Sequence, residues 1–532
     1  MFDWLESDSV VEDDIGMLWH VLLSAHYFLV SVVLIRFYRF VVNADGISYI
    51  SLAQNYLSGH FSQAISGHWA PLISWAVLPL LKLKIDPPLA FKITSIFIGL
   101  AGLFGVDLLL RRLCVPRNVR ILYLLALGPV MAWYAQNFIG ADLLCAVALI
   151  FYLNALLKPD YSERGTAGLS LGVLGAVAYL AKNYNFYFFI LHFSCINVCY
   201  WWLAQDGRRR CNVAINFLVG MLVFALISGV WVGLISNKYH RFTVGTAGAY
   251  NISLVHPGSA GHPVQMDGFF APPNQSAVSV WEDPTLIPLK LWSPARSGWD
   301  FFFYVTLVLH NVFKYVSGLA TNYLFDLTFA FFAYKVFFKG EKIVAGISYV
   351  WLTILLYPLG YFALYYDGQR YVLINAVLLY VLSACAVAAF LEKGGRARLK
   401  YPVFAFVYLS IIALTSYRVY KDYQPIIVRM DRIHDFAEEF AKEHGAGDKT
   451  VASENTAWNY SLATAYYLGC HYVGEARHGM RDTELERQLL ANHVDYYLVE
   501  GDFKRHLAIL KPMPRLKSQP EDLTVYRVKA GG

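Results

Sequence analysis

An aspartate follows the first long apolar run of the sequence. Asp45 comes just after the run 17–42 and precedes Gly46, where the backbone can turn sharply. A carboxylate at the mouth of a membrane cavity can take a proton from a hydroxyl group, which is the work of a general base. Asp45 could equally cap a helix at 47–57, because aspartate is a preferred N-cap residue, and the two roles are compatible.

Other polar side chains stand at the ends of apolar runs. His68 could bind a phosphate or a metal, or remain a solvated group at the membrane surface. Lys182 could neutralise a phosphate, or extend its ammonium to the interface. Arg370, followed by Tyr371, suits bidentate phosphate contact, or it could pair with a nearby aspartate to close a hairpin. Asp142 could bind an acceptor or a metal, or cap the helix that begins there.

A long polar segment at 237–300 is rich in glycine and proline. Its length indicates a functional loop rather than a plain connection. Its acids and histidines could hold a metal, but their spacing matches no known ligand pattern, and the Pro-Gly and Pro-Pro neighbours favour an ordered lid. The residues in question are His256, His262, Asp267, Glu282 and Asp283.

The composition is typical of a membrane protein. Of 532 residues, 57% are hydrophobic and only 15% are charged, with a mean hydropathy of +0.43. A soluble protein of this length is less apolar and carries more charge. The net charge of +6 fits basic cytoplasmic loops, and no nucleic-acid-binding motif is present. The seven cysteines form no CxxC pair, so neither a zinc site nor a disulfide framework is indicated.

Apolar runs of about 20 residues predict about eleven membrane-spanning helices. Two shorter apolar pieces at 47–57 and 71–83 are expected to lie along the membrane surface, as is the first part of 301–338. The acidic N-terminus and the full length of the first run predict an anchor that stays in place. The expected spans are 17–42, 88–110, 121–137, 141–157, 165–181, 184–204, 213–236, the end of 301–338, 343–365, 371–391 and 401–417.

Basic residues orient these spans. Lysines and arginines gather in alternate loops, and the positive-inside rule places those loops and the N-terminus in the cytoplasm. The other face then receives the tail, the loops 43–86 and 237–300, and every candidate named above. The basic clusters lie at 111–120, 158–164, 208–210, 335–342 and 393–400.

The tail changes character at about residue 421. Strand-like segments alternate with helical ones, which predicts a small α/β domain outside the membrane. We therefore expect an α-helical polytopic domain at 1–420 and an extracytoplasmic α/β domain at 421–532. The expected strands are 449–453, 470–473, 496–499 and 524–528, and the expected helices are 458–468, 482–492 and 503–510.

The order of these features resembles the C-superfamily glycosyltransferases (GT-C fold). It is most similar to the branch of bacterial lipid A aminoarabinose transferases, protein mannosyltransferases and RgtA-like enzymes. Two departures are visible, because Gly46 stands where the family often has a second acid, and a single proline follows His68 where two are common. The residues that carry the resemblance are Asp45, His68, Pro71, Leu72, Asp142, Lys182, Arg370 and Tyr371.

The resemblance implies a function and roles. Asp45 corresponds to the family's catalytic carboxylate, and Asp142 to a second acid that serves the acceptor or a metal. The donor phosphate would be held by His68, Lys182, Arg370 and Tyr371. The implied donor is a sugar on polyprenyl phosphate, the acceptor is a lipid, glycan or protein, and the displacement is inverting. A divalent cation such as Mg²⁺ or Mn²⁺ could assist the leaving phosphate.

The implied location is the bacterial inner membrane, with membrane lipids and no nucleic acid as partners. A transporter or flippase of lipid-linked sugars, or a polymerase or ligase of surface polysaccharide, is the alternative. Few charges lie at span centres, no internal repeat is visible, and the polar groups gather on one face rather than at the midplane. These features favour the transferase over the transporter.

Overall fold

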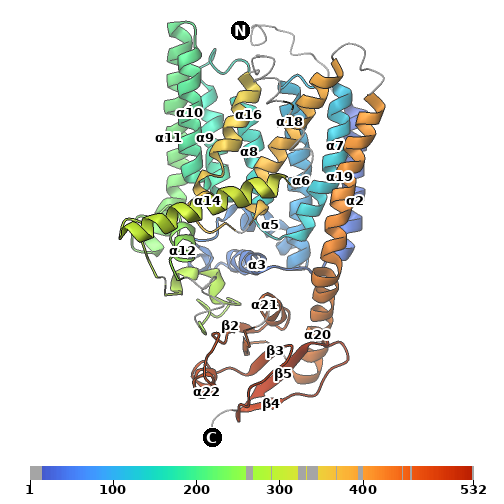
Figure 1. Cartoon of the computed structure of the whole chain (residues 1–532), viewed down its shortest axis with the longest axis vertical. Helices are drawn as coiled ribbons and strands as arrows, with labels where there is room; N and C mark the ends of the chain where they lie inside the picture. Colours follow the sequence, from blue (N-terminus) through green and yellow to red (C-terminus); the bar gives the residue numbers. More distant parts are fainter. Residues whose placement is uncertain are drawn as a thin grey trace.

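The protein is a bundle of long apolar helices with a small sheet domain at one end (Figure 1). The computed structural model describes residues 15–529, apart from 259–267, 289, 321–330, 332–344, 367, 393–399, 446 and 456–457. Within these ranges, seven helices are long and apolar enough to cross a membrane. They are α2 (Met17–Tyr38), α6 (Pro87–Arg112), α7 (Arg117–Asn137), α10 (Asn185–Leu203), α11 (Gly207–Lys238), α18 (Leu373–Glu392) and α19 (Lys400–Asp422).

Shorter apolar helices complete the bundle. α8 (Asp142–Leu156), α9 (Ala167–Ala181) and α16 (Ala345–Leu356), with the one-turn α17 (Leu359–Phe362), stand where spans are expected. The polytopic helical class is therefore confirmed. The span expected at the end of 301–338 lies outside the described residues.

The central helix α8 is shorter than a bilayer core. α8 has 15 residues, so it is about 22 Å long, which is less than the roughly 30 Å of a bilayer core. Nearly all of its side chains are buried against its neighbours.

Several helices lie across the bundle rather than along it. α3 (Ala44–Leu57) and α5 (Leu72–Lys82) cover one end, as the sequence predicts for surface helices. α12 (Ala247–Ser253) belongs to the loop 237–300, and α14 (Gly298–Ala320) crosses the outside of the bundle (Figure 1). Most of the exposed large side chains of α14 are apolar, which suits a helix in the membrane interface; the apolar ones include Trp299, Phe302, Leu309 and Phe313.

The described part of the tail forms a five-stranded sheet in the order β2-β1-β3-β5-β4. β1 pairs in parallel with β2 and β3, because the helices α21 (Trp458–Tyr467) and α22 (Asp482–Ala491) provide the crossover connections. The antiparallel pairs β3–β5 and β5–β4 complete it. The strands are β1 (Thr450–Ser453), β2 (His471–Glu475), β3 (Tyr496–Glu500), β4 (Leu510–Pro512) and β5 (Leu523–Val528). The predicted α/β class of the tail is confirmed.

One predicted helix of the tail is wrong. Residues 503–510 are not helical, and the segment runs into β4, which the sequence pattern did not reveal. Arg505 lies 3.2 Å from Glu454 and 3.1 Å from Asp482 in ion pairs. The backbone N–H of Ala508 donates to Glu486. These tertiary contacts override the local helical tendency.

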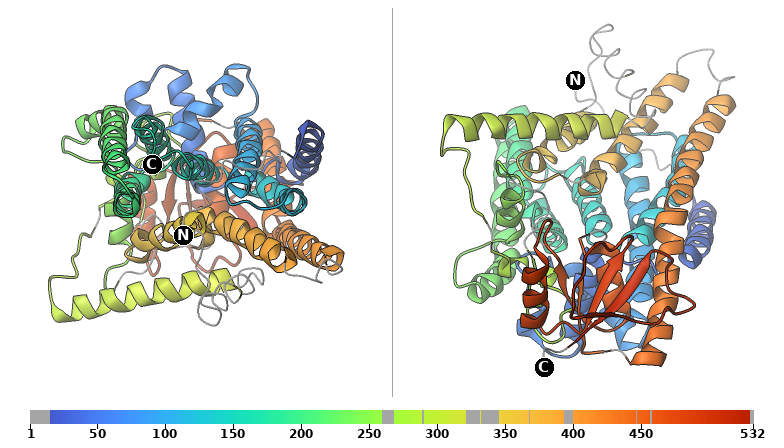
Figure 2. Two further views of the ribbon diagram at one scale, coloured as in Figure 1. Left: turned by 90° about the horizontal axis from the view of Figure 1, so that it is seen from above. Right: turned by 60° about the horizontal axis from the view of Figure 1, so that its bottom comes forward.

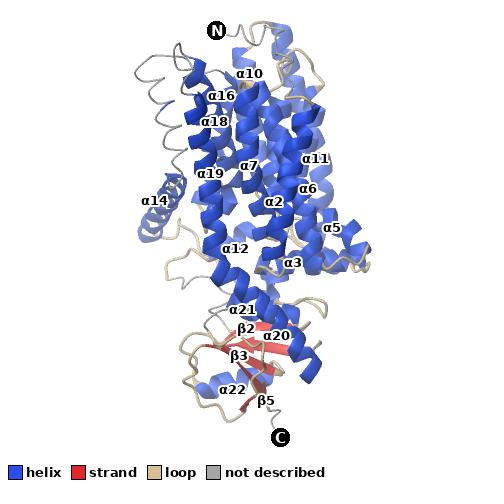
Figure 3. Ribbon diagram, turned by 90° about the vertical axis from the view of Figure 1, so that its right-hand side faces the viewer, coloured by secondary structure: helices blue, strands red, loops and turns tan. Residues whose placement is uncertain are grey.

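A continuous helical rod joins the two parts (Figure 3). α19 passes through a π-turn at Tyr423–Val428 into α20 (Arg429–His444), and Pro425, which has no N–H to donate, lies in that turn. The boundary expected at residue 421 thus falls inside a helix. When the lower end of the molecule is turned forward, the sheet lies in front of the end of the bundle (Figure 2).

Candidate functional site

A cavity of about 1540 Å³ lies where the end of the bundle meets the C-terminal domain. Its walls come from α3, α10, α12, α17, α20 and α21, with the start of α8 and the short 3-10 helix just before α18. The six residues considered above for catalysis and for donor or acceptor binding line it: Asp45, His68, Asp142, Lys182, Arg370 and Tyr371. His256, Glu282 and Asp283 of the loop 237–300 are not among its lining residues. Segments more than 300 residues apart in the chain therefore meet in one space.

Asp45 lies in the first turn of α3, and both of its carboxylate oxygens are held. Arg370 Nη1 lies 2.7 Å from Oδ2, and the indole Nε1 of Trp281 donates to Oδ1 at 3.1 Å. Burial acts to raise the pKa of Asp45, but Arg370 and Trp281 outweigh it, so the pKa lies below its usual value. The carboxylate is therefore ionised at neutral pH.

The capping role that we considered for Asp45 is not adopted. Asn43 is the N-cap residue of α3, and its side chain binds the backbone of Ile139 instead. Gly46 is helical, and its role is close approach rather than a turn, since a Cβ there would lie 2.7 Å from the Cβ of Ile139. The start of α3 is thus packed directly on the loop between α7 and α8.

Arg370 comes from a short 3-10 helix at Gln369–Val372, just before α18. Its guanidinium lies 4.4 Å from the ring centre of Phe138 and donates to the Tyr371 hydroxyl at 3.2 Å. Asp367, the nearby aspartate of the hairpin alternative, lies outside the described residues. The described partner of Arg370 is Asp45, which is 325 residues away in the chain.

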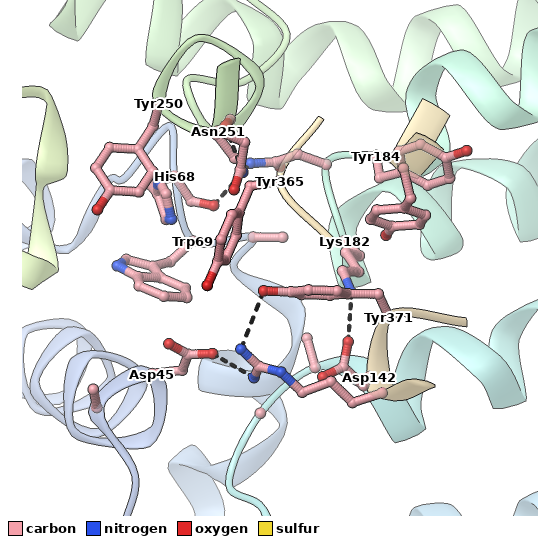
Figure 4. A pocket seen from close by; sticks show the side chains of 18 of the residues that line it. Asp45, His68, Trp69, Asp142, Lys182, Tyr184, Tyr250, Asn251, Tyr365 and Tyr371 are labelled. Carbon is pink, nitrogen blue, oxygen red and sulfur yellow. Dashed lines mark hydrogen bonds and ion pairs between the residues drawn. The ribbon is translucent and has the colours of Figure 1, made fainter. Parts of the chain in front are cut away.

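A second ion pair lies beside the first (Figure 4). Lys182 follows the end of α9, and its Nζ donates to a carboxylate oxygen of Asp142 at the start of α8. The ammonium lies 4.8 Å from the ring centre of Tyr371, a cation–π distance. Lys182 therefore points into the cavity rather than toward the membrane interface. Ala141, not Asp142, is the N-cap residue of α8.

His68 lies among aromatic rings on the other side of Asp45 (Figure 4). The rings of Trp69, Tyr250 and Trp281 have their centres 4.5–5.3 Å away. Burial lowers the pKa of His68 to about 4, so the imidazole is neutral at pH 7. Its Nδ1 is buried without a hydrogen-bond partner. A neutral ring can offer a ligand a hydrogen bond, but no charge.

The acids described here do not fit a metal site. Asp45 and Asp142 are each paired with a cation. In the described ranges, no three His, Cys, Asp or Glu side chains come together. In the loop 237–300, Glu282 binds Ser51 while Asp283 lies 3.3 Å from Lys238. His262 and Asp267 lie outside the described residues.

Lys92 ties together the two loops that carry the site. Its buried Nζ donates to the backbone carbonyls of Tyr38, Val41 and Gln136, at the ends of α2 and α7. The last carbonyl groups of a helix lack partners within the helix, and the Lys92 ammonium donates to such carbonyls at two helix ends. Asp45 follows one end and Asp142 the other, so Lys92 fixes their separation.

Replacing Lys92 by Met is expected to destabilise the protein. The methionine keeps the volume but leaves buried carbonyls unpaired, which costs about 2–3 kcal/mol. The midpoint of thermal unfolding in detergent should fall by a few degrees. Lys82→Met, at an exposed lysine of α5, is the matched control and should leave the midpoint unchanged. A K92M midpoint equal to that of the control would contradict the role of Lys92 in joining the two loops.

Glu282 is a buried acid whose stability effect depends on pH. Burial raises its pKa to about 8, although Ser51 and the backbone of Val278 donate to its carboxylate. Because the folded pKa lies above the unfolded one, the protonated form stabilises the fold at low pH. That stabilisation is lost as the pH rises from about 5 to about 8.

Replacing Glu282 by Gln should remove this pH dependence. The amide is neutral at every pH, and its N–H₂ can donate to Ser51 Oγ, which in turn lies 3.2 Å from the Ser276 carbonyl oxygen. Thermal unfolding midpoints measured from pH 5 to pH 9 should fall for the wild type and fall less for E282Q. Glu521→Gln, at a side chain that is 91% exposed, should follow the wild type. Parallel curves for E282Q and the wild type would contradict this assignment.

The comparisons with known proteins concern the fold. No family model and no curated protein matches the chain. The crystal structure of ArnT from Cupriavidus metallidurans bound to undecaprenyl phosphate matches with a TM-score of 0.55 and 12% identity, over 96% of this chain and 98% of that chain. Archaeoglobus fulgidus AglB, an oligosaccharyltransferase solved with an inhibitory peptide and a dolichol-phosphate, matches with a TM-score of 0.51 and 12% identity, over 91% of this chain and 69% of that chain.

ArnT and AglB are glycosyltransferases of the GT-C type. The chain has the GT-C fold. The fold resemblance inferred from the sequence is thereby confirmed, and the chain is a multi-pass membrane protein. The Archaeoglobus fulgidus enzyme has also been solved with Zn and sulfate, and that structure matches with a TM-score of 0.50 and 12% identity, over 89% of this chain and 68% of that chain.

The site of this GT-C chain also contains residues that sequence reasoning missed. Trp281 touches the Asp45 carboxylate, and the Asn183 amide donates to the carbonyls of Gly67 and His68. Trp281 lies in a single 3-10 turn (Val280–Glu282) of the long loop, which is too short to show a periodicity, so no sequence pattern marks it. Asn183 stands next to Lys182 between two apolar runs, and that position could have drawn attention to it.

Proposed function

We propose that the chain is an integral membrane glycosyltransferase that moves a sugar from a polyprenyl-phosphate donor to an acceptor on the extracytoplasmic face. One observation carries the proposal: Asp45, Lys182 and Arg370 gather in a single cavity at the end of an apolar bundle. A base and two cations are the groups that such a transfer needs. The fold shared with ArnT and AglB supports it.

The cavity offers separate surfaces for the lipid and its head group. Between α10 and α17 its wall is apolar, with Phe188, Leu191 and Leu359. Lys182 and Arg370 lie at the polar end, close to Tyr371. The polyprenyl chain would lie along the apolar wall while its phosphate reaches the cations. The ArnT structure, solved with undecaprenyl phosphate, supports a lipid phosphate as the ligand.

The donor phosphate would exchange partners with the two acids. In the structure Arg370 pairs with Asp45, and Lys182 pairs with Asp142. Guanidinium and ammonium groups bind phosphate strongly, so donor binding would draw both cations away from the carboxylates. Asp45 would then face the acceptor as a free base, while Asp142 would stay close to Lys182 or bind the acceptor.

The reaction would be a single displacement. Asp45 takes the proton of the acceptor hydroxyl, and the acceptor oxygen forms a bond to C1 of the sugar. The bond between C1 and the phosphate oxygen breaks, and the negative charge on the leaving polyprenyl phosphate is stabilised by Lys182 and Arg370. Attack from the opposite side inverts C1. No three His, Cys, Asp or Glu side chains come together among the described residues, so we derive no step through a metal.

Membrane topology supports the proposed face. The basic clusters within the described residues, at 111–120, 158–164 and 208–210, lie at the end of the bundle away from the C-terminal domain, and the positive-inside rule assigns them to the cytoplasm. The cavity and the C-terminal domain then face outward from the inner membrane. The loop 237–300 covers the cavity through α12 and Trp281 and would keep water from the reacting sugar.

Sugar transfer by the purified protein in liposomes tests the function. A panel of labelled polyprenyl-phosphate sugars is offered with membrane-extract acceptors, and both transfer and movement of the labelled lipid between leaflets are measured. We expect transfer of at least one sugar. Movement of the lipid without transfer would replace the proposal by a transporter, and neither transfer nor movement with any donor would overturn it.

A further inference from the structure

We propose that Trp281 is a positioning residue that orients the Asp45 carboxylate, and that the edge of the C-terminal sheet holds Trp281 in place. This inference rests on the proposed function, because Asp45 is its proposed base. Trp281 does not touch the reacting atoms in this scheme. It acts through Asp45.

Trp281 and Arg370 fix the carboxylate from two directions. The indole Nε1 lies 3.1 Å from Asp45 Oδ1, and Arg370 Nη1 lies 2.7 Å from Oδ2. When the donor phosphate draws Arg370 away, the indole N–H remains as the fixed contact to Asp45. The indole N–H carries no charge, so the phosphate does not draw it away from Asp45. Its contact with Oδ1 therefore persists through the reaction and directs the other carboxylate oxygen toward the acceptor.

The ring of Trp281 cannot turn freely. Its side chain is buried, and the rings of Trp69, His68 and Tyr250 surround it with centres 5.2–5.5 Å away. The indole of Trp69 donates to the carbonyl of Trp281 at 2.9 Å. Packing on several sides locks the rotamer, which is what a group that orients a base requires.

On one side, the backbone around Trp281 is bound to α3, the helix that carries Asp45. The Ser51 hydroxyl donates to the carboxylate of Glu282 at 2.8 Å. The Ser276 hydroxyl donates to the side chain of Asn55 at 2.7 Å. The loop and the helix therefore move together.

On the other side, the same loop lies along β2. The backbone N–H of Tyr472 donates to the carbonyl of Val278 at 2.7 Å, and Ser279 forms a parallel bridge with Tyr472. His471 Nδ1 lies 2.8 Å from the Ala277 carbonyl oxygen. β2 is the last strand on that side of the sheet, so the loop covers an otherwise open edge. A short chain of contacts thus joins the C-terminal domain to Asp45.

Replacing Trp281 by Phe removes the indole N–H and keeps an aromatic ring. We expect kcat to fall about tenfold while the donor KM stays within about twofold, because a hydrogen bond to a charged group is lost and the phosphate contacts remain. Trp292→Phe is the matched control, since the Trp292 indole donates to the Ile252 carbonyl in the same loop but away from the cavity. It should keep the wild-type kcat.

The pKa of Asp45 gives a readout that does not need sugar transfer. Loss of a donor to the ionised form raises the pKa, so the acid limb of the activity profile and the pH midpoint of carbodiimide labelling of Asp45 should both move upward in W281F. Peptide mass spectrometry measures the labelling. Arg370 and His68 also act on Asp45, and Tyr49, Tyr250 and Tyr371 interact with it. Lys182 and Asp142 act on Tyr371. All of these groups stay unchanged in the comparison.

A second variant tests the contact with the sheet. His471→Ala removes one of the bonds from β2 to the loop and should shift the labelling midpoint in the same direction, by a smaller amount. His478→Ala, at an exposed histidine of the same domain, is its control. Unmoved midpoints in both W281F and H471A would overturn the proposal. A shift in W281F, with no transfer by the wild type from any donor, would support the positioning role and refute the proposed function.

Discussion

Replacing Asp45 by Asn is expected to reduce sugar transfer by about three orders of magnitude, since general-base assistance contributes roughly 10²–10⁴-fold. The asparagine has the same shape and its oxygen can still accept from Trp281, but it cannot take a proton from the acceptor. Initial rates in liposomes at saturating donor measure the loss. Donor KM should change less than kcat, because the phosphate is held by other residues.

The control for Asp45→Asn is another acid changed in the same way. Asp435→Asn, at a largely exposed side chain of α20, should retain full activity. Both variants should elute as folded monodisperse protein from a sizing column. Equal transfer by D45N and the wild type would show that Asp45 is not the base, and Asp142 would then be the next candidate for that role.

Replacing Arg370 by Gln should weaken donor use by about 10- to 100-fold in kcat/KM. A charge-assisted hydrogen bond to phosphate is worth about 1.5–3 kcal/mol, and the glutamine keeps a donor without the charge. The same change releases Asp45 from its ion pair, so the pKa of Asp45 should rise and the acid limb of the pH profile should move to higher pH.

A matched change for Arg370→Gln is Arg432→Gln, at a half-exposed arginine of α20. Titration of the donor against fixed acceptor separates the two effects, because lost phosphate contact raises the donor KM while a shifted base lowers the rate at low pH only. A donor KM within twofold of the wild type would show that Arg370 serves Asp45 alone.

Much of this architecture can be predicted from the sequence because charges are rare in it. Basic clusters in alternate loops placed the polar residues at one end of the bundle, and the structure brings Asp45, Asp142, Lys182 and Arg370 together there. In an apolar chain, the polar residues at the helix ends gather at the ends of the bundle, outside its apolar layer. The predicted surface helices follow from the same reasoning, since their apolar runs are too short to span.

The pairing of these residues could not be predicted. Asp45 and Arg370 are 325 residues apart, and local rules offered a helix cap as an alternative for one and a hairpin partner for the other. In the folded chain the two residues pair with each other instead, through a tertiary contact. Trp281 was missed for a related reason, because its position depends on β2, a strand almost 200 residues further along the chain.

The rod formed by α19 and α20 sets how the C-terminal domain is rotated about the helix axis. A helix advances about 1.5 Å and turns about 100° with each residue. A single inserted residue in the rod would therefore swing the sheet by more than a quarter of a turn and carry β2 away from the loop beside it. An insertion of seven residues would return the domain to within about 20° of its original rotation but would move it about 10 Å along the helix axis. The length of the rod thus sets both the direction in which β2 faces and its distance from the loop that carries Trp281.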